Sequence, residues 1–229
     1  MDTPITLRFF RGRLPHWLVA DRPYFVTVCR KGSLPLALLA DLQRLHEQAS
    51  NATDEELPPR PSDTLDGHWG EYFKRFEAAL DGTVASPRDL TTPVVAKTIL
   101  NSLQWLRNRG WRVWACGVMP SHLHMVLHNG DGHSDRLTED LGRFKNFTGR
   151  EANRLLGLSG RFWQRESFDH WCRSHEHWLR FVLYTAHNPV KAGLAPTWQA
   201  WPWTVMDPEV EKILDQAETT EAAPNPSRS

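Results

Sequence analysis

Runs and periodic patterns of apolar residues predict alternating strands and helices along the chain. Segments rich in β-branched and aromatic residues predict strands at residues 24–31, 111–118, 122–127 and 162–171. Apolar residues at helical spacing predict helices at residues 93–109, 134–156 and 175–187. This order predicts an α+β fold in which helices pack over one antiparallel sheet.

Local signals fix where several of these elements begin and end. Thr92 and Pro93 suit the N-cap and first position of a helix, and Gly110 suits its end. Residues 119–121 read as a turn, so the strands on either side of it should be antiparallel neighbours. Ser174 suits the N-cap of the last helix, which we expect to stop before Asn188 and Pro189.

The segment 134–156 has the pattern of a long amphipathic helix. Its expected inward side chains are Leu137, Leu141, Phe144, Phe147 and Leu155. Its expected outward side chains are Arg143, Lys145, Arg150 and Arg154. The outer face of this helix should therefore be basic.

Two acidic segments interrupt or follow the folded part. Residues 47–67 combine an acidic run with several prolines and read as a surface loop, within an acidic insertion at about residues 47–92. Residues 207–229 are acidic and poor in apolar residues, so we expect a mostly disordered tail. One domain, residues 8–206, should hold the core.

Composition excludes some classes of protein. The chain has 229 residues, of which 40% are hydrophobic, so it can bury a core. No stretch approaches 18 apolar residues and the first residues lack an apolar signal region, so we expect a cytoplasmic protein without a membrane span. The three cysteines are far apart and should be small buried side chains.

The charge distribution keeps a nucleic-acid partner possible although the net charge is zero. Residues 1–46 and 93–206 carry net charges of +4 and +6, whereas residues 47–92 and 207–229 carry −6 and −4. Local basic patches set the electric field that a phosphate backbone meets. Each block could equally be a solvated face.

His122 and His124 are the first candidates for chemistry. On a strand, both imidazoles would project from one face while Leu123 points to the core. Two neutral imidazoles side by side make a pair of metal ligands. The alternative is a half-exposed strand with incidental histidines. A second pair, His175 and His177, falls on a helix, where positions two apart diverge, and should be solvated.

Tyr184 is the second candidate. Asn188 follows it by one helical turn, so the two side chains share a helix face. A metal bound by His122 and His124 could orient a phosphate for attack by this phenol, with Asn188 as a neutral oxygen ligand. The alternative is a packed helix residue.

Five segments together resemble one protein family. Met119-Pro-Ser-His-Leu-His-Met-Val-Leu127 is similar to the MPNHxHLL signature of single-tyrosine HUH transposases, with Ser121 where the family commonly has Asn. Arg161-Phe-Trp-Gln-Arg-Glu-Ser-Phe-Asp-His170 and Tyr184-Thr-Ala-His-Asn-Pro-Val-Lys-Ala-Gly-Leu194 resemble motifs of the REP-associated tyrosine transposases. The opening segments at residues 13–17 and 24–27 also fit that branch.

This resemblance implies a ferredoxin-like antiparallel sheet with helices packed on one face, and an enzyme that cuts and joins single-stranded or hairpin DNA. It implies Tyr184 as the nucleophile of a 5′-phosphotyrosine intermediate, and His122, His124 and Asn188 as ligands of Mg²⁺ or Mn²⁺, with no nucleotide cofactor. The implied partner is DNA with REP-like palindromes, bound by a nucleoid-associated monomer or homodimer.

Basic side chains and one tryptophan are the candidates for DNA binding. They are Arg8, Arg11, Arg13, Arg143, Lys145, Arg150, Arg154, Arg161, Arg165 and Trp163. Two other functions remain open. One is a metal-dependent hydrolase that uses His122, His124, an acidic residue such as Asp169 and an activated water. The other is a non-catalytic regulator that binds hairpin DNA.

Overall fold

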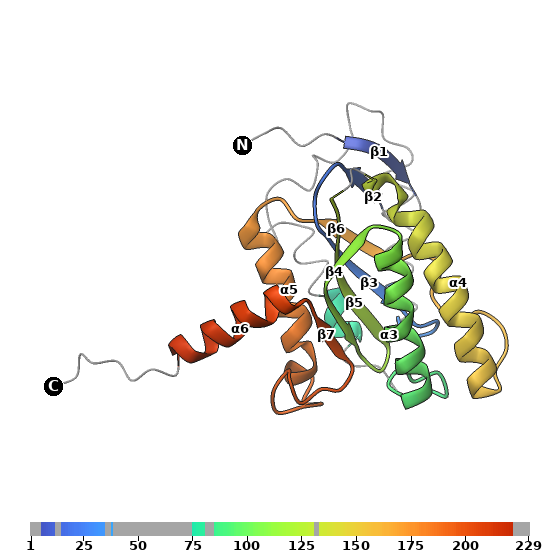
Figure 1. Ribbon diagram of the computed structural model, residues 1–229. Helices are drawn as coiled ribbons and strands as arrows, with labels where there is room; N and C mark the ends of the chain where they lie inside the picture. Colours follow the sequence, from blue (N-terminus) through green and yellow to red (C-terminus); the bar gives the residue numbers. More distant parts are fainter. Residues whose placement is uncertain are drawn as a thin grey trace.

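The computed structural model describes residues 6–11, 15–34, 38, 75–80, 85–130 and 133–221 (Figure 1). Its strands are β1 (Thr6–Arg11), β2 (Pro15–Val19), β3 (Tyr24–Cys29), β4 (Trp111–Val118), β5 (His122–Asn129), β6 (Phe168–Trp171) and β7 (Thr204–Met206). Its helices are α3 (Pro93–Asn108), the 3₁₀ turn η1 (Ser134–Arg136), α4 (Leu137–Leu156), α5 (His175–Lys191) and α6 (Pro208–Glu221). A short helical segment also spans residues 75–80.

The main sheet is antiparallel and has five strands in the order β6-β3-β5-β4-β7. Two strand–helix–strand units, β3-α3-β4 and β5-α4-β6, interleave so that β3 and β5 lie at the centre. This is the ferredoxin-like arrangement, extended at one edge by β7. The expected α+β fold is confirmed. Strands β1 and β2, which the sequence analysis did not predict, form a separate hairpin.

Helices α3 and α4 cover one face of the sheet (Figure 1). Successive strand residues point to opposite faces, and on β3 the side chains of Tyr24, Val26 and Val28 enter this core. They pack with residues such as Leu103 of α3 and Phe144 of α4. This apolar layer is the largest hydrophobic cluster of the described residues, and it packs the sheet against the two helices.

The expectation that helices pack on one face holds for α3 and α4, whereas helix α5 packs against the opposite face and reaches the sheet at Gly117 of β4. A Cβ atom at position 117 would lie 3.1 Å from the carbonyl oxygen of Thr185, so a side chain there would push the helix away. Phe25 and Phe181 stack across this interface with ring centroids 4.3 Å apart. The close approach places the inner face of α5 directly over the central strands.

Two helices differ from their expected form. In α4, Phe147 is 53% exposed and Leu155 is 36% exposed, so the expectation that they point inward is wrong. Phe147 falls beside the stripe that Leu141 and Phe144 present to the sheet, whereas Leu155 lies on that stripe but in the last turn of the helix. Helix α5 runs through Pro189 to Lys191, because bonds from Ala192 N to Asn188 O and from Leu194 N to Pro189 O close its last turn.

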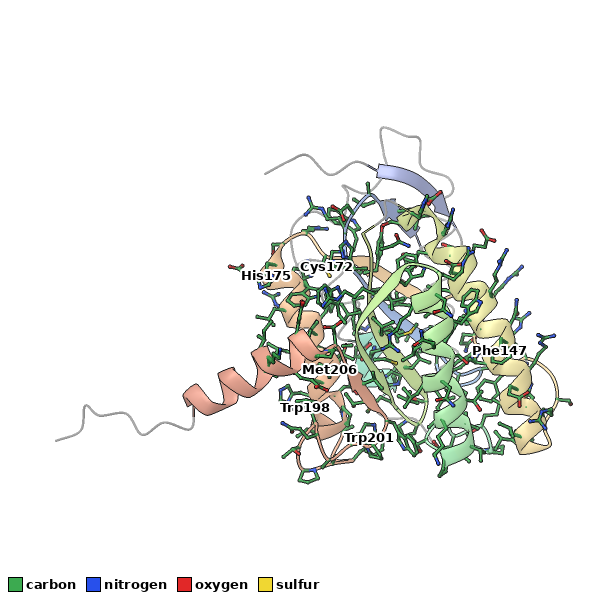
Figure 2. The ribbon with its side chains drawn as sticks, viewed as in Figure 1. Phe147, Cys172, His175, Trp198, Trp201 and Met206 are labelled. Atoms are coloured by element: carbon green, nitrogen blue, oxygen red, sulfur yellow. The ribbon has the colours of Figure 1, made fainter. Side chains whose placement is uncertain are left out.

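The segment after residue 206 also differs from the expected tail, since residues 208–221 form α6 (Figure 2). Val210 and Leu214 are buried with Trp198 and Met206 in the core beneath α5. The acidic side chains Asp207 and Glu209 both pair with Arg112, at 2.9 and 2.8 Å. The buried apolar side chains and the two ion pairs with Arg112 explain why this segment packs as a helix. Residues 222–229 and the expected loop at 47–67 lie outside the described residues.

The three cysteines are free and buried, as expected. Burial raises their thiol pKa values, that of Cys116 to about 12, so all three stay protonated at neutral pH. In the described part of the chain, no helix is both long enough and apolar enough to cross a membrane.

Candidate metal and tyrosine site

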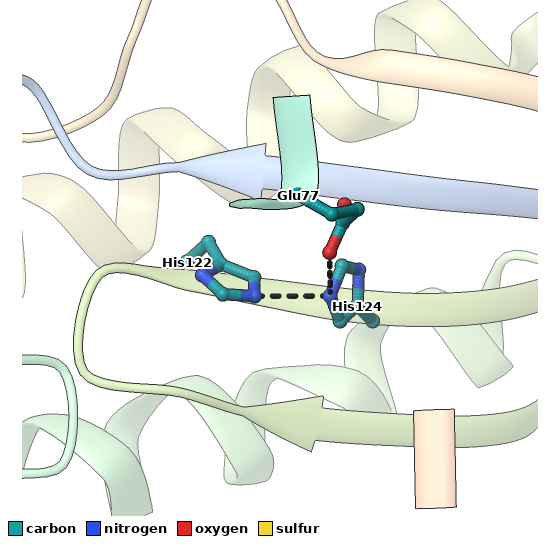
Figure 3. Close-up of side chains that lie close together, drawn as sticks. All are labelled: Glu77, His122 and His124. Carbon is teal, nitrogen blue, oxygen red and sulfur yellow. Dashed lines mark hydrogen bonds and ion pairs between the residues drawn. The ribbon is translucent and has the colours of Figure 1, made fainter. Parts of the chain in front are cut away.

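Three separate elements bring five polar side chains together in the space between the sheet and α5. His122 and His124 alternate with Leu123 on β5 and therefore project from the same face. Tyr184 and Asn188 come from α5, one turn apart, and Glu77 comes from the helical segment at residues 75–80. Ligand atoms of Glu77, His122 and His124 all lie within 4.8 Å of one another (Figure 3).

The two imidazoles are held in a fixed orientation. Their Nε2 atoms face each other at 3.0 Å, while the Nδ1 atoms lie 2.9 Å from Ser121 Oγ and 3.0 Å from Thr27 Oγ1. Ser121 donates its proton to the carbonyl of Leu80, so its oxygen accepts the Nδ1–H of His122. The lone pair of His122 is thereby left on Nε2, the atom that faces the centre of the site.

Burial and neighbouring charges set the protonation of the site at neutral pH. Burial, reinforced by the charge of His124, lowers the pKa of His122 to about 3, so this imidazole is neutral. Burial alone would raise the pKa of Glu77. The neighbouring His124 and His122 and the hydrogen bond from Tyr184 outweigh it and lower this pKa to about 2. The site therefore offers a neutral imidazole and an ionised carboxylate.

Tyr184 and Asn188 complete the cluster from the α5 side. The Tyr184 hydroxyl donates a short hydrogen bond to Glu77 Oε2, and its ring meets that of His124 edge to face at 5.3 Å. Asn188 is 2% exposed, and its Nδ2 lies 3.4 Å from His124 Nε2. The sequence prediction that Tyr184 and Asn188 share a helix face is consistent with this arrangement.

The donor set fits a divalent metal ion. Glu77 Oε1 and Asn188 Oδ1 are buried and have no hydrogen-bond partner among the described residues. Buried polar atoms normally have partners, and these two oxygens belong to side chains whose other polar atoms approach His124, so a cation bound there would satisfy them. One carboxylate, one amide and two imidazoles together form a mixed oxygen and nitrogen donor set of the kind that holds a divalent metal ion.

Glu77 is the residue that sequence reasoning missed. It lies 45 positions before His122, in the acidic stretch whose composition predicts an insertion. Its neighbours Phe76 and Leu80 are buried with Cys29 in a small apolar cluster, which turns Glu77 inward. An acidic residue flanked by apolar ones at helical spacing was the available signal.

Asp169, the acidic residue of the hydrolase hypothesis, lies on the other face of the sheet. It pairs in register with Val26, whose side chain enters the α3–α4 core, whereas the adjacent Thr27 contacts His124. Among the described residues, Glu77 is the carboxylate that joins the histidines. The assignment of Asp169 to a shared site with His122 and His124 is therefore wrong.

The predicted DNA-binding residues separate into groups. Lys145, Arg150, Arg161, Arg165 and Trp163 line one groove of about 410 Å³ beside α4. Arg143 and Arg154 instead pair with Glu139 and Glu151 on the same helix. Arg8 and Arg11 lie on β1, and Arg13 lies outside the described residues.

Trp163 does not offer an open ring for stacking. It is 3% exposed, belongs to the core cluster and donates its indole N–H to Thr148 Oγ1 at 3.0 Å. Trp163 therefore lines the groove from the side of the hydrophobic core. Stacking of a base on the face of this indole is therefore not available.

No protein-family model and no curated protein matches the chain. Among solved structures, it is similar to a REP-associated tyrosine transposase bound to a REP hairpin. The match covers 84% of this chain and 81% of that one, at 17% sequence identity and a TM-score of 0.46. It is a distant structural likeness.

Proposed function

We propose that this protein is a metal-dependent enzyme that cleaves and rejoins single-stranded or hairpin DNA through Tyr184. The observation that carries the proposal is the meeting of the Tyr184 hydroxyl with His122, His124, Glu77 and Asn188 in one buried cluster. A tyrosine beside a metal-ligand set suits phosphoryl transfer, because a phenol needs nearby positive charge to act as a nucleophile. The motifs that resemble REP-associated tyrosine transposases point to the same chemistry.

The residues take distinct roles in this reaction. The Tyr184 hydroxyl passes its proton to Glu77, its hydrogen-bond partner, as its oxygen bonds to phosphorus. The bond from phosphorus to the 3′-oxygen breaks, and the departing oxygen takes a proton to become a 3′-hydroxyl. His122, His124, Glu77 and Asn188 would hold Mg²⁺ or Mn²⁺, which supplies charge stabilisation to the phosphate when bound. The hydrogen bond to Glu77 orients the phenol. The resulting 5′-phosphotyrosine keeps the phosphodiester energy, so rejoining needs no nucleotide cofactor.

The DNA partner is proposed to be a palindrome of the REP kind, held by basic side chains. Arg150, Arg161, Arg165 and Lys145 are the best placed because they gather at one groove. Arg8 and Arg11 of the β1–β2 hairpin and Arg13 remain candidates, and Arg143 and Arg154 are weaker ones because each already has an acidic partner. Such a protein would work in the cytoplasm at the nucleoid, as a monomer or homodimer.

The test is a gel assay for a covalent adduct. The protein is incubated with end-labelled hairpin DNA from around its own gene and Mn²⁺, then run under denaturing conditions. We expect a slow, protease-sensitive band that Tyr184→Phe abolishes while binding of the hairpin is kept. Tyr24→Phe is the matched control, because Tyr24 lies in the α3–α4 core, where its hydroxyl bonds to the backbone of Val19, and should not affect the adduct.

The other candidate functions give different results. An adduct that persists in Tyr184→Phe would contradict the assignment of the nucleophile. Metal-dependent cleavage without an adduct, unchanged in Tyr184→Phe, would indicate a hydrolase that uses activated water, with Glu77 rather than Asp169 as its acidic residue. Hairpin binding without cleavage would indicate a regulator.

A further inference from the structure

The helical segment at residues 75–80 covers the tyrosine cluster. From this segment Glu77 reaches Tyr184, and its Oε2 lies 3.4 Å from His124 Nε2 (Figure 3). His122 and His124 are almost completely buried beneath it. A phosphate within a DNA strand is too bulky to reach imidazoles that are buried to this extent. Either the segment 75–80 or helix α5 must therefore move before a phosphate can meet the metal ligands.

Helix α5 is firmly attached to the sheet. Phe181, Val182 and Ala186 lie in an apolar cluster that also includes side chains of α6. The backbone of α5 rests directly on Gly117, where even a Cβ atom would lie 3.1 Å from the carbonyl oxygen of Thr185. A displacement of α5 would break these contacts together, so α5 is poorly suited to opening the site.

The segment 75–80 is held by a smaller set of apolar contacts. Phe76 and Leu80 enter the smallest of the three apolar clusters of the described residues, which includes Cys29 at the end of β3. The Ser121 hydroxyl also donates a hydrogen bond to the carbonyl oxygen of Leu80 at 3.3 Å. Regions with few buried apolar contacts open locally at a lower free energy than the core. The segment is therefore the part of the cover that opens most easily.

The segment 75–80 also completes the metal-ligand set. Glu77 Oε1 is buried without a hydrogen-bond partner among the described residues. Glu77 can ligate an ion only while the segment is in place, whereas His122 and His124 belong to the central strand β5 and stay there. An ion that gains a ligand in one of two states binds that state more tightly and shifts the equilibrium toward it. A bound metal ion should therefore hold the segment closed.

We propose that the segment 75–80 is a lid that opens to admit the scissile phosphate and closes when Glu77 meets the metal ion. Closure also returns Glu77 to the Tyr184 hydroxyl and excludes water from the site. The lid rests on the proposed function for its substrate and its metal ion. Its response to the metal ion can be measured without DNA.

Cys29 is a natural probe for the opening of the lid. It is buried with Phe76 and Leu80, whereas Cys116 and Cys172 are buried in the two larger apolar clusters. The full chain is treated with N-ethylmaleimide, in EDTA or in Mn²⁺, and mass spectrometry measures the labelling of each cysteine over time. The two other cysteines then serve as internal controls for unfolding.

In EDTA we expect Cys29 to react more than about tenfold faster than Cys116 and Cys172, because local opening requires less free energy than opening of the larger clusters. Mn²⁺ at ten times its dissociation constant should slow the labelling of Cys29 about five- to tenfold, since binding to the closed state reduces the open fraction by about that factor. The labelling of Cys116 and Cys172 should change less.

Variants test the two contacts of the lid. Ser121→Ala should speed the labelling of Cys29 in EDTA about fivefold, which corresponds to one net hydrogen bond. Ser102→Ala is the matched control, because Ser102 is also buried and donates to a backbone carbonyl, that of Thr98, but within α3. It should leave the rate unchanged. Glu77→Gln keeps the side-chain shape without the charge, so Mn²⁺ should slow labelling less than about twofold.

Two results would overturn the proposal. One is labelling of Cys29 that is as slow as that of Cys116 and Cys172, since the segment would then open only when the protein unfolds. The other is an unchanged Cys29 rate at Mn²⁺ concentrations that saturate the protein in isothermal titration. Protection of Cys29 by Mn²⁺ together with failure of the adduct assay would support the lid and reject the proposed tyrosine chemistry.

Discussion

The two faces of β5 show how one strand serves both stability and chemistry. Leu123, Met125 and Leu127 point into the apolar core beneath α3 and α4. His122 and His124, the residues between and before them, point into the polar cluster beneath α5. The two sets share backbone, register and burial, since His122 is 1% and Leu123 is 0% exposed. What differs is whether the buried atoms have satisfied partners.

That difference predicts opposite responses to mutation. Apolar side chains in a packed core contribute to folding through contacts that a smaller residue loses. The polar cluster contains two buried oxygens without a hydrogen-bond partner among the described residues, which cost stability in the absence of a ligand. Substitutions on the α5 face should therefore affect activity first, and those on the α3–α4 face should affect folding first.

The largest expected effect is that of His124→Ala on DNA cleavage. Loss of one imidazole ligand should lower the Mn²⁺-dependent rate by about a thousandfold, since metal stabilisation of a transition state is worth several kcal/mol and each 1.36 kcal/mol is tenfold. Single-turnover cleavage measures the rate, and isothermal titration with Mn²⁺ measures the metal affinity. Wild-type cleavage and Mn²⁺ affinity in this variant would show that His124 is not a ligand.

The adjacent substitution, Leu123→Ala, should show the reverse pattern. It removes a fully buried side chain from the α3–α4 core, which costs about 2–5 kcal/mol of unfolding free energy. Denaturant unfolding in EDTA measures this cost. The Mn²⁺ affinity of the folded fraction should stay close to wild type. A loss of metal affinity as large as that in His124→Ala would mean that the two faces are not separable.

The sequence predicted the elements whose pattern is local. Strands β4 and β5 and helix α3 begin at the expected residues, because β-branched runs, the turn at Met119–Ser121 and Pro93 act over a few positions. The N-cap of α5 is also confirmed, since Ser174 Oγ accepts a hydrogen bond from His177 N. Thr92 occupies the N-cap position of α3 without a side-chain hydrogen bond.

The rest depends on contacts between distant residues. Pro189 reads locally as a helix stop, yet packing of α5 on the sheet carries the helix past it. Glu77 could not be assigned from spacing, because its role comes from being packed over β5. Ser121 departs from the family motif, and its contacts with His122 and Leu80 belong to the folded state.

A second pair of histidines lies on the same face of the sheet as His122 and His124, and it can be compared with them. His170 of β6 and His177 of α5 have ring centroids 5.1 Å apart, and both pack near Phe181. The expectation that His177 is solvated is therefore wrong. Their Nε2 atoms are buried without a partner among the described residues, and no carboxylate there joins them as Glu77 joins His122 and His124.

This pair predicts a smaller, pH-dependent effect on stability. Burial, then the charges of His177 and Arg173, lower the pKa of His170 to about 3, and burial, then Arg173 and Arg180, lower that of His177 to about 4. Unfolded histidines titrate near 6.5. Between these values the unfolded chain binds protons that the folded chain does not. Stability should fall as the pH decreases from about 6.5, with a slope of about 1.4 kcal/mol per pH unit for each histidine.

His170→Phe tests this contribution, because a phenyl ring keeps the packing against Phe181 and cannot be protonated. Denaturant unfolding in EDTA at several pH values between 4.5 and 7.5 should give a slope that is shallower by about 1.4 kcal/mol per pH unit than in wild type. His175→Phe is the control, since His175 is exposed at the start of α5 and should leave the slope unchanged. Equal slopes in wild type and His170→Phe would mean that His170 becomes protonated without unfolding. His170, which lies away from the cluster of Glu77, His122 and His124, would then take up a proton in the folded protein despite its burial.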